Sequence, residues 1–436
     1  MTRALFAIDG AIDALTPAER AAMYSRGFGS DPSVRDKVVS LIARVREGGD
    51  AALRDMALEL DGARLERLEI PRKAWDRALS ALDREVVRAL ERARENVARA
   101  HAAWIPVCTE VETEPGVVIG RRADPLGRVG VYAPGGRAAY PSSVLMGVVP
   151  ARVAGVREVI LCSPPRPDGE PAREVLAAAA LAGADRVFAL GGAGAVAAMA
   201  FGTESIPRVD RIVGPGNAYV AEAKAQVGAQ VGIDSPAGPS ELLVVWDQSS
   251  SAGSIAREII AQAEHDPDAA VAVVLLPGAS RDALCHTLEQ QLVDAPRGDI
   301  ARQALAVRGA LLHARDADAA IAFAAEWAPE HLLLAVSDPE ALLPNIRNAG
   351  TVFLGASASV VFGDYLTGAN HVLPTGGAAR AYSGLSTQDF MRWTTYQRVD
   401  RAAAARLAGD VGLLADVEGL PAHAAAARAW QTGKHG

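Results

Sequence analysis

The sequence lacks features that mark several common classes of protein. It has three cysteines in 436 residues, and Cys108, Cys162 and Cys285 lie far apart. An odd number of scattered cysteines excludes a disulfide framework and a cysteine zinc cluster. The first residues, MTRALFAIDG, lack the apolar core of a signal peptide, and no uncharged apolar run is long enough to span a bilayer. We therefore expect a soluble, cytoplasmic protein with no membrane partner.

Aromatic residues and blocks of like charge are also scarce. Aromatic residues make up 5% of the chain, and the net charge is −8. No run of like charges is long enough to suggest a nucleic-acid surface or an acidic tail, so we expect no nucleic-acid partner. Half of the chain is hydrophobic, with much Ala, Val, Leu and Gly, as expected where helices pack on a parallel sheet. The length allows two or three domains with sizeable cores.

Strands and helices alternate from Arg128 onward. In residues 128–239, RVGVYAPGG begins the first of four successive strand–helix units, and in residues 240–383 a second series begins at ELLVVWD. Repeated units of this kind predict parallel, doubly wound sheets with right-handed crossovers. The predicted fold class is α/β, with two Rossmann-like domains that face a cleft.

The flanking segments are predicted to be helical. Asp31 is a possible N-cap, Pro32 lies in the first turn, and Gly48–Gly49 would break the helix. After about Ser383 the chain is rich in Ala and Arg and is predicted to be helical to its end. We expect a helical segment at 1–26, one domain formed by 27–127 and 240–383, a second domain at 128–239, and a helical arm at 384–436.

Three glycine-rich loops follow strands of the domain at 128–239. They are YAPGG (132–136), GGAGA (191–195) and GPGN (214–217). Ligands of open α/β sheets lie beyond the carboxyl ends of the strands, and helix N-termini favour phosphate. Gly192 and Gly194 match glycines of a dinucleotide fingerprint, with Ala197 at its third position. Small residues also allow helix and strand to pack, so a cofactor site and plain packing both remain open.

Polar candidates occur in the second series. Gln262 and His265 in AQAEHD are three residues apart at a helix end, so they share a face and can share a metal ion. The alternative is a capped helix terminus, because a cation there also suits the helix dipole. Asp364 and His371 lie in a glycine-studded loop after a strand, where structural aspartates are also common.

The stretch AEWAPEHLLLAV places two titratable residues at the start of a buried strand. Pro329 ends a helix, and Glu330 and His331 directly precede the apolar residues 332–336. A carboxylate and an imidazole at this position can have shifted pKa values and act as acid and base. The alternative is a solvated turn between helix and strand.

Seven motifs together resemble the histidinol dehydrogenase family. They follow the order of the family over nearly the whole chain: VGVYAPGG, GPGNAYVAEAK, DSPAGPSELLV, AQAEHDPD, APEHLLL, GDYLTGANHVLPTGG and EGLPAH. The resemblance implies a zinc- and NAD-dependent enzyme. It would oxidise L-histidinol to L-histidine with two NAD molecules, the last step of histidine biosynthesis.

The resemblance also implies which residues form the site. The implied zinc ligands are Gln262, His265 and Asp364 of one subunit and His423 of the partner subunit, in a homodimer that exchanges its arms. The implied substrate contacts are Ser240, Gln262, His265, His331, Asp364, His371, Glu418 and His423. Glu330 and His331 match the catalytic pair. The implied cofactor positions are Tyr132, Asn217 and Gly194, although Gly194 replaces a glutamine of the family motif GGAQA and so removes a side-chain contact to NAD.

The expected chemistry explains why both titratable residues are needed. Oxidation of an alcohol to an acid removes two hydrides and adds one water between them. A neutral imidazole, with an unperturbed pKa of about 6.5, makes His331 a suitable base in both hydride steps. Glu330 can activate the water. Zinc has no redox role and can anchor the imidazole and amine of histidinol.

Two other functions fit part of the sequence. A related dehydrogenase of another diol or amino alcohol, such as sulfopropanediol, would keep the core. Glu418 and His423 suit a substrate that carries amine and imidazole, whereas a sulfonate would favour added Arg or Lys. A non-catalytic binding protein can also be built from two α/β lobes, but it has no use for an acid–base pair such as Glu330–His331.

Overall fold

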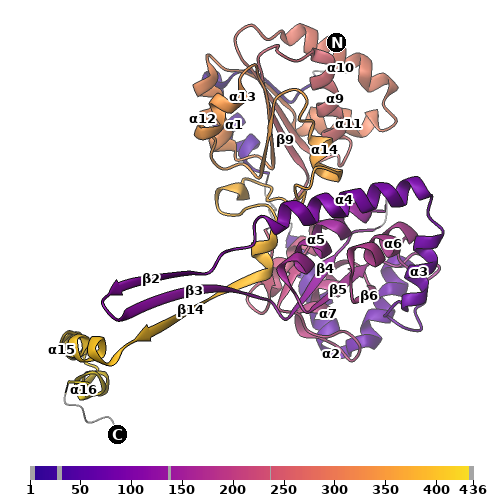
Figure 1. Ribbon diagram of the computed structural model, residues 1–436. Coiled ribbons are helices and arrows are strands. Elements are labelled where there is room, and N and C mark those ends of the chain that lie inside the picture. Colours follow the sequence, from indigo (N-terminus) through magenta and orange to yellow (C-terminus); the bar gives the residue numbers. More distant parts are fainter. Residues whose placement is uncertain (1–4, 27–31, 136–138, 236, 432–436) are drawn as a thin grey trace. The chain divides into compact units, whose positions relative to one another are not determined.

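The computed structural model describes residues 5–26, 32–135, 139–235 and 237–431. The chain divides into two compact units, unit 1 (Met1–Trp104 and Leu126–Phe390) and unit 2 (Ile105–Pro125 and Met391–Gly436). Figure 1 labels their elements. The predicted N-cap Asp31 lies outside the described residues.

One parallel sheet of unit 1 has the strand order β6-β5-β4-β7-β8. Its strands are β4 (Arg128–Tyr132), β5 (Glu158–Ser163), β6 (Arg186–Ala189), β7 (Arg211–Val213) and β8 (Gly232–Ile233). The helices between them are α5 (Pro141–Ala154), α6 (Arg173–Ala182), α7 (Gly192–Phe201) and α8 (Ala218–Val227). The first strand lies in the middle, as in a doubly wound nucleotide-binding half.

The second parallel sheet of unit 1 has the order β1-β11-β10-β9-β12-β13. Its strands are β1 (Ile8–Ala11), β9 (Glu241–Trp246), β10 (Ala270–Leu275), β11 (Ala310–His313), β12 (His331–Ala335) and β13 (Thr351–Leu354). The helices of this part are α1 (Pro17–Tyr24), α9 (Ala252–Ala263), α10 (Arg281–Asp294), α11 (Gly298–Arg308), α12 (Ala317–Trp327), α13 (Pro339–Leu342) and α14 (Val360–Tyr365). Short 3-10 helices occur at Ile12–Ala14, Leu343–Asn345, Ala378–Arg380 and Thr387–Phe390.

Helices cover both faces of this second sheet (Figure 1). Apolar side chains of α9, α10 and α11 form one core with it, and side chains of α1 and α12 form the other. Because both faces are covered, β9, β10 and β12 are buried along their whole length. The predicted α/β class with two doubly wound sheets is confirmed. That the two sheets face a common cleft remains a prediction.

The structure groups the amino-terminal third differently from the predicted domains. Helices α2 (Pro32–Asp61), α3 (Arg72–Ser80) and α4 (Arg84–Ala102) pack on α5–α8, not on the sheet formed by residues 240–383. The segment 1–26 is not only helical, because β1 pairs with β11. An apolar stripe shows that a helix is buried but not which sheet it covers, and a four-residue strand has too few positions for a pattern. The predicted break at Gly48–Gly49 is confirmed, since Gly49 has φ 51° inside α2.

Unit 2 contains strands that the sequence analysis did not predict. In the three-stranded sheet β14-β3-β2, β3 (Val117–Pro125) pairs antiparallel with β2 (Thr109–Glu114) and with β14 (Met391–Val399). Helices α15 (Arg401–Val417) and α16 (Pro421–Ala429) follow. The arm at 384–436 is therefore not helical throughout. The β-branched and aromatic residues of MRWTTYQRV were a strand signal.

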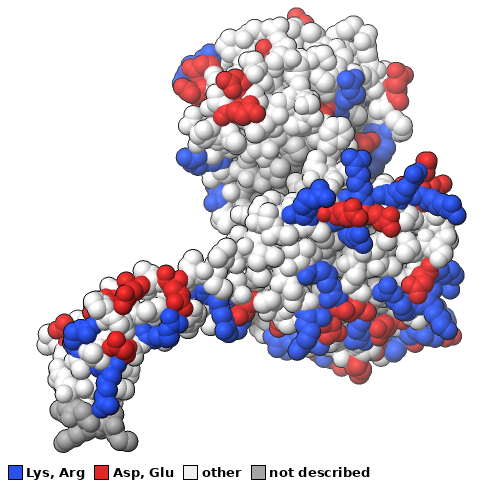
Figure 2. All heavy atoms as spheres, viewed as in Figure 1, with Lys and Arg blue, Asp and Glu red and all other residues white. Residues whose placement is uncertain are grey.

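On the face shown in Figure 2, basic and acidic side chains are interspersed. Within the described residues, no helix is long and apolar enough to cross a membrane.

Candidate active site and cofactor cavity

Glu330 and His331 are buried at the amino end of β12. Their exposed fractions are 6% and 4%, so the solvated-turn alternative is wrong. The αL conformation of Ala328 (φ 52°) ends α12, and β12 begins at His331. The site thus lies at the amino ends of the strands, whereas ligands of open α/β sheets usually lie at the carboxyl ends.

Hydrogen bonds to neighbouring backbone orient both side chains. The N–H of Glu241 donates to Oε2 of Glu330 over 2.7 Å. Nδ1 of His331 lies 3.0 Å from the carbonyl oxygen of Glu241. A carbonyl oxygen can only accept, so Nδ1 carries the proton and Nε2 is the nitrogen available to act as a base.

Asp364 faces the other nitrogen of His331. Its Oδ1 lies 3.5 Å from Nε2 of His331, and its backbone carbonyl lies 2.7 Å from Nδ1 of His371. Nε2 of His371 lies 3.4 Å from the Ser143 hydroxyl. The structure therefore brings together Glu330, His331, Asp364 and His371.

The charges of this cluster shift its pKa values. Burial alone would lower the pKa of His331, but the carboxylates of Glu330 and Asp364 outweigh burial and raise it to about 10. Burial alone would raise the pKa of Asp364, but His331, His371 and His265 together lower it. Burial lowers the pKa of His371.

Gln262 has the features of a metal ligand. Its side chain is 3% exposed, and its Nε2 has no hydrogen-bond partner among the described residues. A half-turn of the amide exchanges nitrogen and oxygen at that position. Gln262 lies in the last turn of α9, and His265 follows the end of this helix. This donor set fits a divalent cation such as zinc.

Histidine and carboxylate ligands alone do not complete such a site. Over the described ranges, no group of three or more His, Cys, Asp and Glu side chains is arranged to hold a metal ion. Of these residue types, the expected set takes only His265 and Asp364 from unit 1. Among the other predicted residues, Ser240 directly precedes β9. Glu418 and His423 are exposed positions of unit 2.

All three predicted cofactor residues line a cavity of about 680 Å³. Tyr132 ends β4, Gly194 lies in the first turn of α7, and Asn217 caps α8 by accepting N–H bonds from Tyr219 and Val220. The Tyr132 hydroxyl accepts the N–H of Gly192 over 3.1 Å. This cavity lies at the carboxyl ends of β4 to β7, where a doubly wound sheet binds ligands.

Gly194 also has a packing role that the sequence did not show. A Cβ atom there would lie 2.8 Å from Cε of Met56, which comes from α2. The space beside this residue is therefore filled by α2, and a glutamine at position 194 would require Met56 to move.

Glu241 and Arg26 were missed by the sequence analysis. Both are buried and form an ion pair, and the N–H of Glu241 donates to Glu330. A signal for Glu241 was present, because PSELLVV places a carboxylate directly before a fully apolar strand, as APEHLLL does. Arg26 had no comparable signal.

Known proteins resemble this chain over nearly its whole length. The family model described as histidinol dehydrogenase matches residues 25–430. Histidinol dehydrogenase from Methanosarcina mazei is 45% identical over 420 residues, which cover 95% of this chain and 96% of that protein. The Halobacterium salinarum protein of the same name is 46% identical over 416 residues, covering 95% and 97%.

A solved structure shows the same fold. The crystal structure of histidinol dehydrogenase from Elizabethkingia anophelis superposes with a TM-score of 0.92 at 32% identity and covers 99% of both chains. Nothing in these similarities favours a sulfopropanediol dehydrogenase. The chain therefore belongs to the histidinol dehydrogenase family.

Proposed function

We propose that this protein oxidises L-histidinol to L-histidine in two NAD-dependent hydride steps through bound histidinaldehyde, the last step of histidine biosynthesis. The observation that carries the proposal is the buried Glu330–His331 pair beside Asp364, in a chain of this family. A buried acid–base pair whose imidazole has a strongly raised pKa is typical of a catalytic site.

His331 is the base of both hydride steps. In the first step its Nε2 takes the hydroxyl proton of histidinol while a hydride leaves the alcohol carbon for NAD. The imidazolium of His331 gives this proton to the aldehyde oxygen when water adds, while Glu330 takes a proton of that water. In the second step the neutral His331 takes a proton of the hydrated aldehyde while the second hydride leaves, and both residues then release their protons to solvent. His331 can do so only when neutral. A cation bound at Asp364 would offset one of the two carboxylates that hold the pKa of His331 high.

Glu330 activates the water that adds to the aldehyde. Its carboxylate is held by the Glu241 N–H and lies 3.5 Å from Nδ1 of His331. Both groups start a strand whose backbone is bonded on both sides, so their geometry is preorganised. A proton from water can thus be received without movement of the main chain.

Gln262, His265, Asp364 and His423 of the partner subunit would hold a zinc ion. When bound, zinc would act as a Lewis acid that anchors the imidazole and amine of histidinol. Ser240, His371 and Glu418 would provide further substrate contacts. The active enzyme would be a cytoplasmic homodimer. The partner's arm would contribute residues to each site, so the sites would be shared.

NAD would occupy the cavity at Tyr132, Gly194 and Asn217. The amino end of α7 opens into this cavity, and its cap residue Gly191 has no side-chain bond to the helix N–H groups. The Tyr132 hydroxyl accepts the Gly192 N–H, and the N–H groups at a helix start favour the diphosphate of a dinucleotide.

The half-reactions test the roles of the catalytic pair. NADH formation is followed by absorbance with histidinol or with supplied histidinaldehyde. His331→Asn should slow both oxidations, because both need the base. Glu330→Gln should slow aldehyde oxidation more, since only that half needs activated water. The exposed His286→Asn serves as control. Equal losses in both halves for Glu330→Gln would contradict its role.

A mixing experiment tests the shared site. His331→Asn and His423→Ala chains are co-expressed, and the mixed dimers are purified. If arms are exchanged, one site of each mixed dimer combines an intact His331 with an intact His423, so activity returns although each parent is inactive. If each site were formed by one chain, every site would keep one lesion and mixed dimers would stay inactive.

A further inference from the structure

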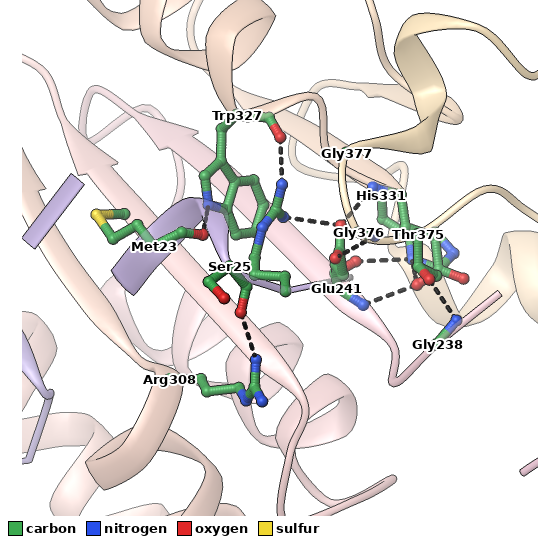
Figure 3. Close-up of polar contacts among 12 residues, drawn as sticks. Met23, Ser25, Gly238, Glu241, Arg308, Trp327, His331, Thr375, Gly376 and Gly377 are labelled. Carbon is green, nitrogen blue, oxygen red and sulfur yellow. Dashed lines mark hydrogen bonds and ion pairs between the residues drawn. The ribbon is translucent and has the colours of Figure 1, made fainter. Parts of the chain in front are cut away.

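Glu241 joins three distant segments of unit 1 through its carboxylate (Figure 3). Its Oε1 accepts the N–H of Gly376 over 2.7 Å. Its Oε2 lies 2.8 Å from Nη1 of Arg26 and 3.4 Å from the N–H of Glu330. Gly376 belongs to the loop that follows His371. One carboxylate thus connects the amino-terminal segment, the start of β12 and the loop of a predicted substrate contact.

The backbone of Glu241 holds the catalytic side chains directly. Its N–H donates to Glu330, and its carbonyl receives Nδ1–H of His331. Glu241 and Glu330 are therefore bonded reciprocally, each carboxylate to the other residue's N–H. A shift of the Glu241 backbone would move both Glu330 and His331.

Arg26 holds Glu241 and the entry to β12 together. Its side chain is 4% exposed, and its Cζ lies 3.6 Å from the ring centroid of Trp327. It also donates to the carbonyl oxygen of Trp327, the last residue of α12. Trp327 in turn donates from Nε1 to the carbonyl oxygen of Met23 over 3.2 Å. The amino-terminal segment is thereby attached to the residues that lead into Glu330.

Stability alone does not account for this ion pair. Desolvation of two charges offsets most of their attraction, and apolar residues of similar volume are often as stable. Burial lowers the pKa of Arg26 to about 10 and raises that of Glu241 to about 7, against the attraction of the pair. What an ionised carboxylate adds here is the ability to accept two backbone N–H groups and Arg26 at once.

We propose that Glu241, held by Arg26, is a positioning residue for the Glu330–His331 pair, so that the amino-terminal segment helps to form the active site. This inference rests on the proposed function of that pair.

The test compares Arg26→Met, Glu241→Gln and the double variant. Each single change leaves one buried charge without a partner, so both should lower the melting midpoint. The double variant has no such charge, so its melting midpoint should recover most of the loss. At position 241 of the double variant, however, an amide oxygen replaces the carboxylate that accepts two N–H groups. Because small misplacements of reacting groups cost up to about a hundredfold in rate, we expect its kcat to stay about 10–100-fold low.

The matched control is Arg20→Met/Glu326→Gln. The Nη1 of Arg20 lies 3.0 Å from Oε2 of Glu326, and this exposed ion pair joins α1 to α12. Its kcat should equal that of the wild type. The KM for NAD should be unchanged in all variants, because other residues line the cofactor cavity.

Recovery of kcat together with the melting midpoint in the double variant would show a purely structural role and overturn the proposal. If the double variant does not regain stability, the Arg26→Lys variant distinguishes a positioning role from a purely structural one. Lys keeps the charge but has neither the flat contact with Trp327 nor a second nitrogen to reach the Trp327 carbonyl while it binds Glu241. A lowered kcat at wild-type stability therefore supports positioning, and an unchanged kcat refutes it. A wild-type protein without activity on histidinol would instead contradict the proposed function.

Discussion

The buried pair of Lys224 and Asp234 is expected to hold the Gly214–Asn217 loop of the cofactor cavity. Both side chains are buried and form an ion pair. Nζ of Lys224 donates to the carbonyl oxygen of Gly214 over 3.0 Å, and Asp234 accepts the N–H of Gly214 over 2.7 Å. Gly214 has φ 119°, and a Cβ there would lie 2.1 Å from the carbonyl oxygen of Tyr132. The pair thus fixes a backbone position that only glycine can occupy.

We predict that Lys224→Met destabilises the protein by about 3 kcal/mol. Removal of one partner of a buried ion pair costs about 3–5 kcal/mol. Burial already raises the pKa of Asp234 against the opposing effect of Lys224, so the carboxyl group left behind can take up a proton and limit the loss to the lower end of that range. For a cooperative unit of 150–250 residues, this corresponds to a fall of about 6–12 °C in melting midpoint.

Urea unfolding and NAD titration measure the two consequences. Lys224→Met should shift the unfolding midpoint and weaken NAD binding, because the loop that carries Asn217 loses a support. The exposed Lys73→Met should change stability by no more than about 0.5 kcal/mol. Lys224→Met/Asp234→Asn should recover most of the loss, since no charge is buried and the amide oxygen still accepts from Gly214. A single variant within 1 kcal/mol of the wild type (roughly the median worth of an exposed pair), or a double variant no more stable than the single, would refute the reasoning.

Three further predictions concern the metal, the cofactor cavity and pH. Chelation should abolish turnover and zinc should restore it, and full activity in a verified metal-free sample would contradict the metal assignment. Gly194→Gln should change the free energy of unfolding by no more than about 1 kcal/mol in a denaturant titration, because its Cβ would lie 2.8 Å from Cε, the flexible end of Met56, and replacing a glycine within a helix gains up to about 1 kcal/mol; a loss of about 2 kcal/mol or more would show that Met56 cannot move. Burial lowers the pKa of His101 from 6.5 to about 4, so between these pH values the unfolded chain binds a proton that the folded chain does not. Stability should therefore fall by up to about 3 kcal/mol as pH drops from 6.5 to 4, and His101→Leu should lose that part of the pH dependence; an identical pH profile would count against this.

The sequence by itself determined the local pattern and singled out Glu330 and His331 as the candidate catalytic pair. Apolar runs separated by helical periods specify parallel strands covered on both faces, and both sheets have the expected doubly wound order. Glu330 and His331 stood out because a buried strand rarely begins with two titratable residues. The resemblance implied Tyr132, Gly194 and Asn217 as cofactor positions, and the three residues line one cavity because loops after successive parallel strands meet at one edge of the sheet.

Only the tertiary structure decided which distant segments support these sites. A helical stripe does not encode its partner, so the packing of α2–α4 on α5–α8 and the contact of Met56 with Gly194 could not be read from periodicity. Arg26 reaches Glu241 across 215 positions of sequence. An isolated arginine near the amino terminus carries no local signal, because its burial depends on Trp327 and Glu241, which only the folded chain brings to it.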